Sequence, residues 1–173
     1  MPPVSHGTSE RRPGDADHWL LHFAPHLAHA YTEVWPALTT ADGLRGWLAS
    51  AEVLERHLGG EVRLRWLNGP GTTATGHVTA WDVERVVEYT LSEHGRIRFH
   101  LEPLGTDSTL IRFTNERRGT EADRLDCLAG WHEHFLLLED HLAGAPADWP
   151  SRTANRWSAL RDSYAAQLHR ASR

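Results

Sequence analysis

The chain holds 13 histidines in 173 residues, and their spacing decides whether they could bind a metal ion. A metal site needs several imidazole, thiolate or carboxylate groups that face one point. His132 and His134 lie two residues apart in a helical pattern, so their side chains point away from each other. A second series would need a helix through Pro25, which interrupts helices; its members are His18, His22, His26 and His29. The spacing predicts no metal site and no cofactor.

Cys127 is the single cysteine and therefore the one thiol nucleophile to consider. A reactive thiolate needs a positive group or a His beside it, and the nearest in sequence is Arg124, one helical turn back. We therefore expect a buried, inert thiol. No Gly-x-Ser-x-Gly motif occurs. Gly59-Gly60 is not a phosphate-binding loop, because it lies between two predicted strands and not at the N-terminus of a helix. The sequence identifies no catalytic residue.

The strongest constellation is a set of side chains that several strands and one helix would turn toward a common interior. Its predicted members are Val62, Leu64, Trp66, Tyr89, Phe99, Ile111, Phe113, Asn115, Cys127, Trp131 and Phe135. One interpretation is an apolar ligand cavity with a few polar groups that orient the ligand. The other is that the rings fill the core. Burial of each ring stabilises either arrangement by about 1.5–3 kcal/mol, so the composition leaves both open.

Asn115 and Tyr89 are the polar groups expected inside this interior. An unpaired buried amide costs about 1–3 kcal/mol, so Asn115 should meet a ligand, a water molecule or a backbone group. Trp131 follows Gly130 in the middle of a predicted helix. Glycine there costs about 1 kcal/mol relative to alanine. We interpret Gly130 as making room for a strand or for a neighbouring ring.

The composition is that of one ordinary globular domain. Apolar residues make up 40% and charged residues 24%, and the eight Trp are many for this length. The net charge of -5 argues against nucleic-acid binding, which needs a basic face. No apolar run approaches the roughly 18 residues of a membrane span. A lone cysteine fits a reducing compartment, so we expect a soluble cytoplasmic protein.

Residues 1–17 are rich in Pro, Gly, Ser and charge, and we predict a disordered leader there. A first strand should end near Pro25, followed by two short helices around Val34–Leu38 and Leu44–Leu48, with Asp42 or Thr40 as a cap of the second. From residue 51 the spacing of the apolar residues changes from the helical period of 3.6 residues to the strand period of 2. Strict alternation, as in RIRFHLE at 96–102, together with turn signals such as NGPG at 68–71, predicts an antiparallel meander.

The helical period returns at Thr120, where Asp123 follows three residues later as in a capping box. A long helix is expected over residues 120–142. After a short Pro/Ala linker, a last amphipathic helix should begin at Ser151 and dock back on the domain. Its apolar positions are Trp157, Leu160, Tyr164 and Leu168.

This order of elements and several local motifs resemble the START-like (SRPBCC) helix-grip superfamily. Within this superfamily, the chain resembles the branch that is similar to the C-terminal domain of the activator of Hsp90 ATPase. The motifs are VWPALT at 34–39, Trp47, LGGEVRL at 58–64, Gly76, STLIRFTNE at 108–116 and AGWHEHFLLLEDHL at 129–142. The resemblance implies an α+β fold in which a curved antiparallel sheet wraps a long C-terminal helix. The domain would span residues 18–143, with a linker and docking helix over 144–173.

Members of this superfamily bind hydrophobic molecules, and the resemblance therefore implies non-catalytic binding of such a molecule, for example a secondary metabolite. Three alternatives stay open. The chain could be a protein-interaction module with a chaperone partner, or a polyketide cyclase-like enzyme that uses Tyr89, Asn115 or His22. It could also resemble the START-like proteins that confer resistance to enediyne antibiotics, which are cleaved sacrificially after hydrogen abstraction from a glycine.

Overall fold

One curved sheet forms most of the molecule. The computed structural model describes residues 4–173, and within them nine strands form a single antiparallel sheet. The strands are β1 (Thr8–Arg12), β2 (Asp15–Phe23), β3 (His26–Leu27), β4 (Ala49–Leu54), β5 (Glu61–Trp66), β6 (Thr73–Asp82), β7 (Val86–Leu91), β8 (Gly95–Pro103) and β9 (Thr109–Arg118). Their spatial order is β1-β2-β9-β8-β7-β6-β5-β4, and β3 also pairs with β9. The predicted meander is confirmed from β4 to β9.

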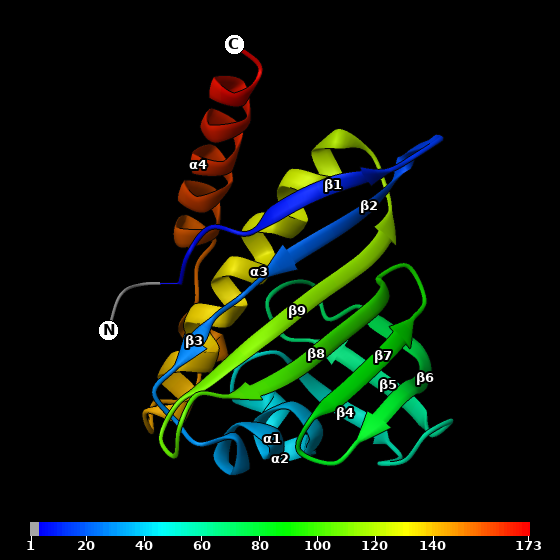
Figure 1. Cartoon of the computed structure of the whole chain (residues 1–173), viewed down its shortest axis with the longest axis vertical. Coiled ribbons are helices and arrows are strands. Elements are labelled where there is room, and N and C mark those ends of the chain that lie inside the picture. The colour runs from blue at the N-terminus through cyan, green and yellow to red at the C-terminus, as the bar shows by residue number, and fades with distance from the viewer. Residues whose placement is uncertain (1–3) are drawn as a thin grey trace.

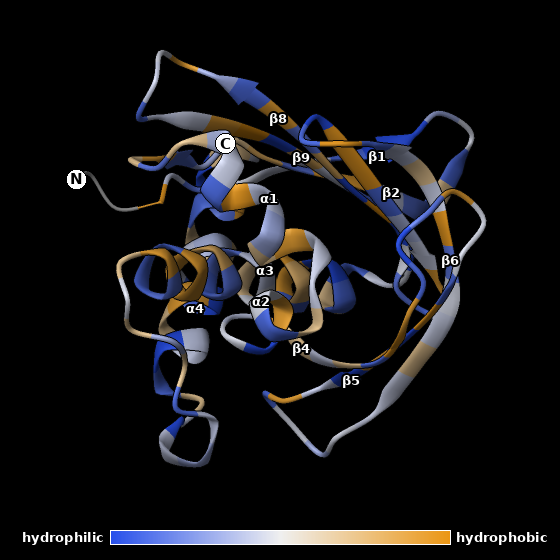
Figure 2. Ribbon diagram, turned by 90° about the horizontal axis from the view of Figure 1, so that it is seen from below, coloured by the Kyte–Doolittle hydropathy of each residue, from blue (hydrophilic) through white to orange (hydrophobic). Residues whose placement is uncertain are grey.

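Four α-helices accompany the sheet in the described part of the chain, and the longest lies inside its curve (Figure 1 and Figure 2). They are α1 (Tyr31–Thr39), α2 (Ala41–Arg45), α3 (Glu121–Leu142) and α4 (Asn155–Ala171), with a short 3-10 turn, η1 (Trp149–Ser151), before α4. The sheet wraps around α3, while α1 and α2 close one end (Figure 1). Seen along the curve, α4 lies beside α3 on the side away from the sheet (Figure 2). This is the predicted α+β helix-grip arrangement.

Two irregularities bend the sheet. The pairing of β4 with β5 shifts register between Ala51 and Val53, and that of β6 with β7 shifts between Val78 and Ala80. Such bulges increase the local twist and bend the strand. Gly76 allows β6 to approach β7 closely, because a Cβ there would collide with the backbone carbonyl of Thr90.

The predicted alternation sets which side chains enter the core. In β5, Val62, Leu64 and Trp66 are 0%, 1% and 9% exposed, whereas the intervening residues face solvent. In the centre of the sheet Phe99 pairs directly with Phe113, with ring centroids 5.1 Å apart. A cross-strand aromatic pair of this kind contributes roughly 0.2–1 kcal/mol beyond an alanine pair.

The N-terminus of α3 has the predicted capping box. The Thr120 hydroxyl accepts the Asp123 N–H, and the Asp123 carboxylate accepts the Thr120 N–H at 2.7 Å. The helix turns Leu128, Phe135 and Leu138 into the core, where each is at most 2% exposed. These three side chains pack α3 into the core.

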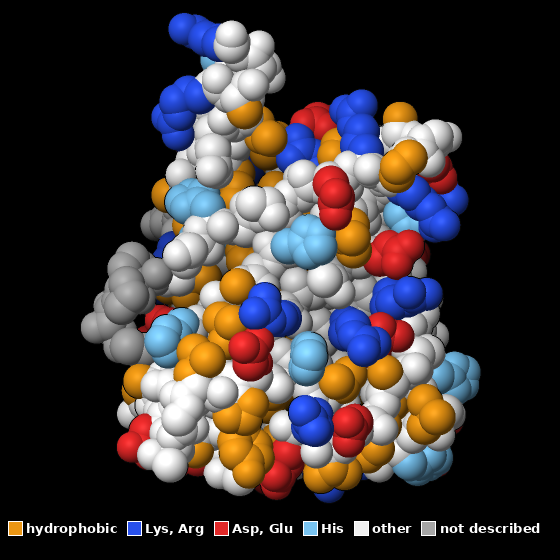
Figure 3. Space-filling model, viewed as in Figure 1, with side chains coloured by type: hydrophobic (Ala, Val, Ile, Leu, Met, Phe, Trp, Pro, Cys, Tyr) orange, Lys and Arg blue, Asp and Glu red, His pale blue; other side chains and the backbone are white. Residues whose placement is uncertain are grey.

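The outer face of the sheet is charged. Figure 3 shows basic and acidic side chains interspersed across it. Glu88 pairs with Arg98, whose Nη1 lies 3.1 Å from Oε2, and with Arg96 at 3.8 Å. Arg112 and Glu102 pair at 2.7 Å on neighbouring strands. Among residues 4–173, no helix combines the length and apolarity that crossing a membrane requires.

The prediction of a disordered leader over residues 1–17 needs correction. Thr8–Arg12 form β1, which pairs with β2, and β2 itself begins at Asp15. β1 is a polar edge strand held by its backbone pairing, so it has no apolar alternation to detect. Gly14, with φ of +81°, makes the turn between the two strands. Residues 1–3 lie outside the described part of the chain.

Two predicted helix boundaries also differ from the structure. The first predicted strand ends at Phe23, near Pro25 as expected, and Thr40 caps α2 by accepting the Gly43 N–H at 2.9 Å. However, α2 ends at Arg45, and Trp47 then points into the core rather than continuing a helix. The last helix begins at Asn155 instead of Ser151, because Trp149–Ser151 form the 3-10 turn.

Candidate ligand-binding site

Most of the predicted interior residues pack together under α3. Eight members are at most 1% exposed: Val62, Leu64, Tyr89, Phe99, Ile111, Phe113, Asn115 and Phe135. Phe113 lies at the centre, with its ring centroid 4.5 Å from that of Trp131 and 5.0 Å from that of Phe135. None of the eight lines the two compartments described below. At these positions the rings fill the core.

The two polar groups expected in this interior have protein partners. The Tyr89 hydroxyl donates to the Leu38 carbonyl at 2.7 Å, and burial raises the pKa of Tyr89 far above its usual value. The Asn115 amide nitrogen donates to the carbonyls of His94 and Arg96 at 2.9 and 3.0 Å. The Asn115 side-chain oxygen accepts the indole N–H of Trp131 at 3.2 Å. Asn115 therefore orients the Trp131 ring.

The remaining three predicted residues meet at an open pocket of about 260 Å³, which we name the apolar compartment. Trp66 comes from the end of β5, and Cys127 and Trp131 come from α3. Trp157, at the start of α4, completes the aromatic wall. The other lining residues are Asn68, Gly69, Pro70, Thr72, His94, Asp126, Gly130 and His134. The compartment thus lies between the β5–β6 loop, α3 and α4.

Gly130 lies beside the Trp157 ring in this compartment, but an added Cβ would make only an ordinary van der Waals contact there. The expectation that a glycine is needed to make room for a neighbouring ring is therefore not borne out. A Cβ added at Gly130 would lie 3.9 Å from Nε1 of Trp157. The same indole nitrogen donates to the Asp126 carbonyl at 3.3 Å. The Trp157 ring is therefore held against the bare backbone of α3 at the wall of the compartment.

His94 orients Trp66 and is uncharged. The indole N–H of Trp66 donates to Nε2 of His94 at 2.9 Å, and the two ring centroids lie 4.7 Å apart. Burial, with a smaller contribution from the positive charge of Arg117, lowers the pKa of His94 to about 4. An imidazole that accepts a hydrogen bond at Nε2 must be neutral and carry its proton on Nδ1.

His134 is also neutral. Its Nδ1 lies 2.8 Å from the Trp47 carbonyl, which can only accept, so Nδ1 carries the proton. Nε2 is then free to accept from the Asn68 amide at 3.3 Å. Burial lowers the pKa of His134 below its ordinary value. Both imidazoles at the compartment wall therefore act as uncharged hydrogen-bond partners.

Cys127 sits at the same wall with little nucleophilic character. Burial raises the pKa of its thiol, although the positive charge of Arg117 partly opposes this. The thiol form is a weak nucleophile at neutral pH. Among residues 4–173 there is no cluster of three or more His, Cys, Asp or Glu side chains placed to hold a metal ion.

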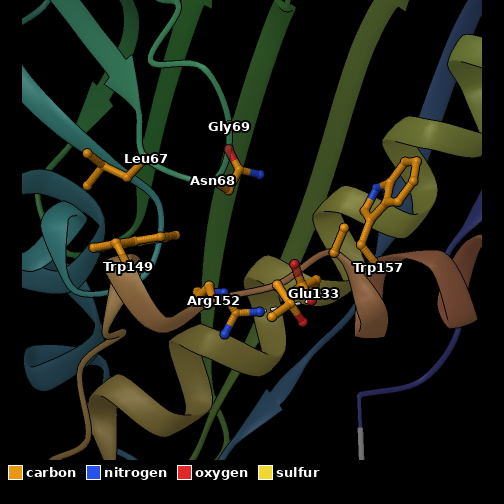
Figure 4. A pocket seen from close by; sticks show the side chains of 9 residues that line it. Leu67, Asn68, Gly69, Glu133, Trp149, Arg152 and Trp157 are labelled. Atoms are coloured by element: carbon orange, nitrogen blue, oxygen red, sulfur yellow. Dashed lines mark ion pairs between the residues drawn. The ribbon is translucent and has the colours of Figure 1, made fainter.

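A second pocket of about 470 Å³ adjoins the first, and we name it the polar compartment. It shares Asn68, Gly69 and Trp157 with the apolar compartment, so the two form one cleft. Its other lining residues are Leu67, Glu133, Trp149, Arg152, Thr153 and Ala154. Figure 4 shows Trp149 and Trp157 on opposite sides, with Arg152 and Glu133 between them.

An ion-pair cluster forms one wall of the polar compartment. Glu133 of α3 is buried, and its Oε2 lies 2.9 Å from Nη2 of Arg152 and 3.3 Å from Nε of Arg156. A buried carboxylate needs such partners, because its desolvation otherwise costs several kcal/mol. The cluster therefore also fixes the segment before α4 against α3.

The sequence did not predict the polar compartment. Trp149 belongs to the stretch predicted as a linker, whereas Arg152 and Thr153 fall within the predicted last helix, whose docking face was expected to include Trp157. The available signal was the pair of tryptophans, Trp149 and Trp157, on either side of the predicted start of the last helix. Their convergence with the β5–β6 loop depends on contacts between residues 80–90 positions apart, which no local period encodes.

Comparisons with known proteins agree with the fold. The family model "Activator of Hsp90 ATPase homolog 1-like protein" matches residues 28–143. No curated protein matches the chain. Among solved structures, a conserved protein of unknown function from Enterococcus faecalis is similar with a TM-score of 0.73 and 18% identity, over 95% of this chain and 91% of that one.

Two further solved structures cover nearly the whole chain. CalU16 from Micromonospora echinospora is similar with a TM-score of 0.72 and 16% identity, over 95% of this chain and 93% of that one. A protein from Bordetella parapertussis has a TM-score of 0.65 and 23% identity, over 94% and 92%. These identities show a shared fold alone. From the family match and the helix-grip architecture, the chain belongs to the Activator of Hsp90 ATPase homolog 1-like family of the START-like (SRPBCC) superfamily.

Proposed function

We propose that this protein binds a hydrophobic small molecule in the apolar compartment without transforming it. The observation that carries the proposal is the set of three indole rings, Trp66, Trp131 and Trp157, at one open pocket. Small-molecule sites are concave, mostly apolar and lined by aromatic side chains with a few polar groups. The compartment has this composition.

The three rings are held in place by the protein itself. Trp66 donates to His94, Trp131 donates to Asn115 and Trp157 donates to the Asp126 carbonyl. Because each indole N–H is satisfied internally, the rings can offer their apolar surfaces without leaving a polar group unpaired. Rings oriented before binding also lose less conformational entropy when a ligand arrives.

The polar groups of the compartment favour binding over catalysis. General acid–base chemistry needs a group whose pKa lies near the working pH and whose proton can move to the substrate. The pKa of His94 is lowered to about 4, and its Nε2 already accepts from Trp66. Nε2 of His134 is engaged by Asn68. These groups are suited to orienting rings and loops.

The test is an NMR titration of the full chain with a panel of flat aromatic and polyketide-like compounds. Binding compounds should shift the indole N–H signals of Trp66, Trp131 and Trp157. The signals of Trp35, Trp47 and Trp81 serve as an internal control, because none of these rings lines the cleft. If no compound in the panel shifts the first three signals selectively, the proposal fails.

A pair of variants sharpens this test. Trp157→Ala should weaken binding of a responding compound about tenfold, which corresponds to the ~1.4 kcal/mol expected for one lost aromatic contact. Trp81→Ala removes a ring of equal size that packs against Trp35, 5.2 Å away, and should leave the affinity unchanged. Equal losses in both variants would point to a general destabilisation rather than to the cleft.

A second candidate function is sacrificial resistance to an enediyne-type antibiotic. The observation that favours it is the presence of two glycines, Gly69 and Gly130, in the wall of the apolar compartment, where a bound drug would lie next to the backbone. Incubation of the protein with such a compound, followed by mass spectrometry, should then give one discrete backbone cut at Gly69 or Gly130. An intact chain, or scattered cuts, would contradict this function.

A further inference from the structure

The C-terminal segment, residues 144–173, builds a large part of the cleft. The family match ends at residue 143, whereas Trp149, Arg152, Thr153, Ala154 and Trp157 line the polar compartment. The helix-grip domain supplies the opposite wall through the β5–β6 loop and α3. The shape and chemistry of the polar compartment therefore depend on a segment that the family pattern does not include.

This segment is fixed to the domain at several points. The Trp149 indole N–H donates to the Arg45 carbonyl at 2.8 Å, and the Ala147 N–H donates to the Gly46 carbonyl at 2.9 Å. Farther along, Nε of Arg161 lies 2.5 Å from the Asp126 carboxylate. The wall that the segment forms is thus positioned before any ligand binds.

The charged side chains that line the cleft, Glu133, Arg152 and Asp126, are already paired. Glu133 has Arg152 and Arg156 as partners, and Asp126 has Arg161. An ion pair that is already formed offers little net attraction to another charge. A charged ligand would lose its hydration without gaining a free counter-ion, which is unfavourable.

Asp148 completes this balance. It lines a hollow next to the polar compartment together with Arg152 and Arg156, and its carboxylate accepts the Ser151 hydroxyl at 2.7 Å. Three carboxylates and three guanidinium groups therefore surround this end of the cleft: Asp126, Asp148, Glu133, Arg152, Arg156 and Arg161. No excess of either sign is present among them.

The other groups of the polar compartment are neutral donors and acceptors beside flat rings. Asn68 offers an amide and Thr153 a hydroxyl, and both are exposed to the cleft. The rings of Trp149 and Trp157 flank them (Figure 4). This combination suits a group that has C–H faces to pack on indole and hydroxyl or amide groups to hydrogen-bond, such as a polyol ring.

We propose that the cleft takes an uncharged amphipathic ligand, in which a flat apolar ring system is joined to a neutral, hydroxyl- or amide-bearing group. The ring system occupies the apolar compartment, and the polar group occupies the polar compartment, where residues 144–173 select it. This inference rests on the proposed binding function and adds the class of ligand to it.

The experiment compares three probes on the full chain by calorimetry and NMR: 2-naphthol, 2-naphthyl β-glucoside and 2-naphthyl sulfate. The glucoside should bind at least about fivefold more tightly than naphthol, a difference of ~1 kcal/mol that two or so neutral hydrogen bonds provide. The sulfate should bind more weakly than the glucoside. All bound probes should shift the Trp131 indole signal.

Two variants test whether the C-terminal segment causes the difference in affinity between the glucoside and naphthol. Trp149→Ala and Thr153→Val should each reduce the advantage of the glucoside while leaving the affinity for naphthol unchanged. Thr153 is exposed and Val has nearly the same shape. The Thr153 hydroxyl also accepts the Asn155 N–H at 3.4 Å at the start of α4, so an unchanged affinity for naphthol is the control that the segment stays in place. Trp81→Ala is the matched control and should preserve the difference between the probes.

The outcomes separate the two proposals. If naphthol binds and shifts Trp131 but the glucoside binds no more tightly, or the sulfate binds best, the ligand class is wrong and the binding function stands. The same holds if the glucoside keeps its advantage in both variants. If none of the three probes binds, both proposals are overturned for this type of ring.

Discussion

Asn115 shows how a single residue can look like a ligand-binding group and yet serve the fold. The sequence indicated a buried amide that needs partners, and the structure supplies them from the protein. The carbonyls of His94 and Arg96 accept its amide hydrogens, and its side-chain oxygen accepts the indole N–H of Trp131. Asn115 thus couples the sheet to α3, and its effect on a ligand would pass through the orientation of Trp131.

Removal of this amide should destabilise the protein. In Asn115→Ala the carbonyls of His94 and Arg96 and the N–H of Trp131 lose a buried partner, so we expect a loss of about 1–3 kcal/mol in the free energy of unfolding. Chemical denaturation followed by tryptophan fluorescence measures it. Thr114→Ala changes the neighbouring residue on the other face of β9 and should cost much less. If Asn115→Ala lowers the free energy of unfolding by less than ~0.5 kcal/mol, the hydrogen bonds of Asn115 do not hold the sheet and α3 together as described.

At the scale of elements, the docking of α4 on α3 decides whether the cleft exists. Tyr164 of α4 is buried. Its hydroxyl accepts the Gly7 N–H at 2.8 Å and is hydrogen-bonded to Nδ1 of His132 on α3, also at 2.8 Å. A backbone hydrogen bond between His132 and Val4 partly opposes the effect of burial on the pKa of His132. The N-terminal segment, α3 and α4 are thereby tied together at one point.

Loss of the Tyr164 hydroxyl should loosen α4. In Tyr164→Phe the Gly7 N–H and Nδ1 of His132 stay buried without this partner, and we expect a destabilisation of about 1–3 kcal/mol. Hydrogen–deuterium exchange should rise in residues 155–171 and much less in β7 or β8. Tyr31→Phe removes the same hydroxyl from a half-buried tyrosine at the start of α1 and is the control. Unchanged exchange in α4 would mean that other contacts carry its docking.

At the scale of the whole molecule, three neutral histidines hold together the elements around the cleft. His94 binds Trp66, His132 binds Tyr164 and His134 binds the Trp47 carbonyl. Burial is the main cause that lowers the pKa of each, and for His94 and His132 the value falls to about 4. In the unfolded chain a histidine has a pKa near 6.5.

This difference predicts sensitivity to mild acid. Above about pH 6.5 both states hold these histidines neutral and the protein has its full stability. As the pH falls from ~6.5 to ~4 the unfolded chain binds protons that the folded protein refuses, so stability decreases. Below about pH 4 this contribution levels off. Denaturation midpoints measured at intervals from pH 7.5 to 4 should follow that curve.

The variant His94→Gln identifies one histidine as a source of the effect. Glutamine can still accept from Trp66 through its side-chain oxygen but does not titrate. The variant should therefore show a shallower fall in stability over the same pH range. A slope that is equal in His94→Gln and the unaltered protein would rule out this residue as a contributor.

The sequence by itself determined the helix-grip fold and most of its interior. The alternation of apolar and polar residues predicted correctly that Val62, Leu64 and Phe113 face the core, and the Thr120–Asp123 pair marked the start of α3. These signals are readable because periodicity and capping are local properties of a few consecutive residues. The polar strand β1 escaped prediction for the same reason, since its residues are polar and carry no apolar period.

Only the tertiary structure decided which predicted residues fill the core and which line a cleft. Phe99, Phe113 and Phe135 pack against one another, whereas Trp66 and Trp131 reach an opening that Trp157 of α4 closes from the other side. The outcome depends on the space left where α3, α4 and the β5–β6 loop meet. That space is fixed by contacts between distant residues, such as Trp149 with Arg45, and side-chain type alone does not encode it.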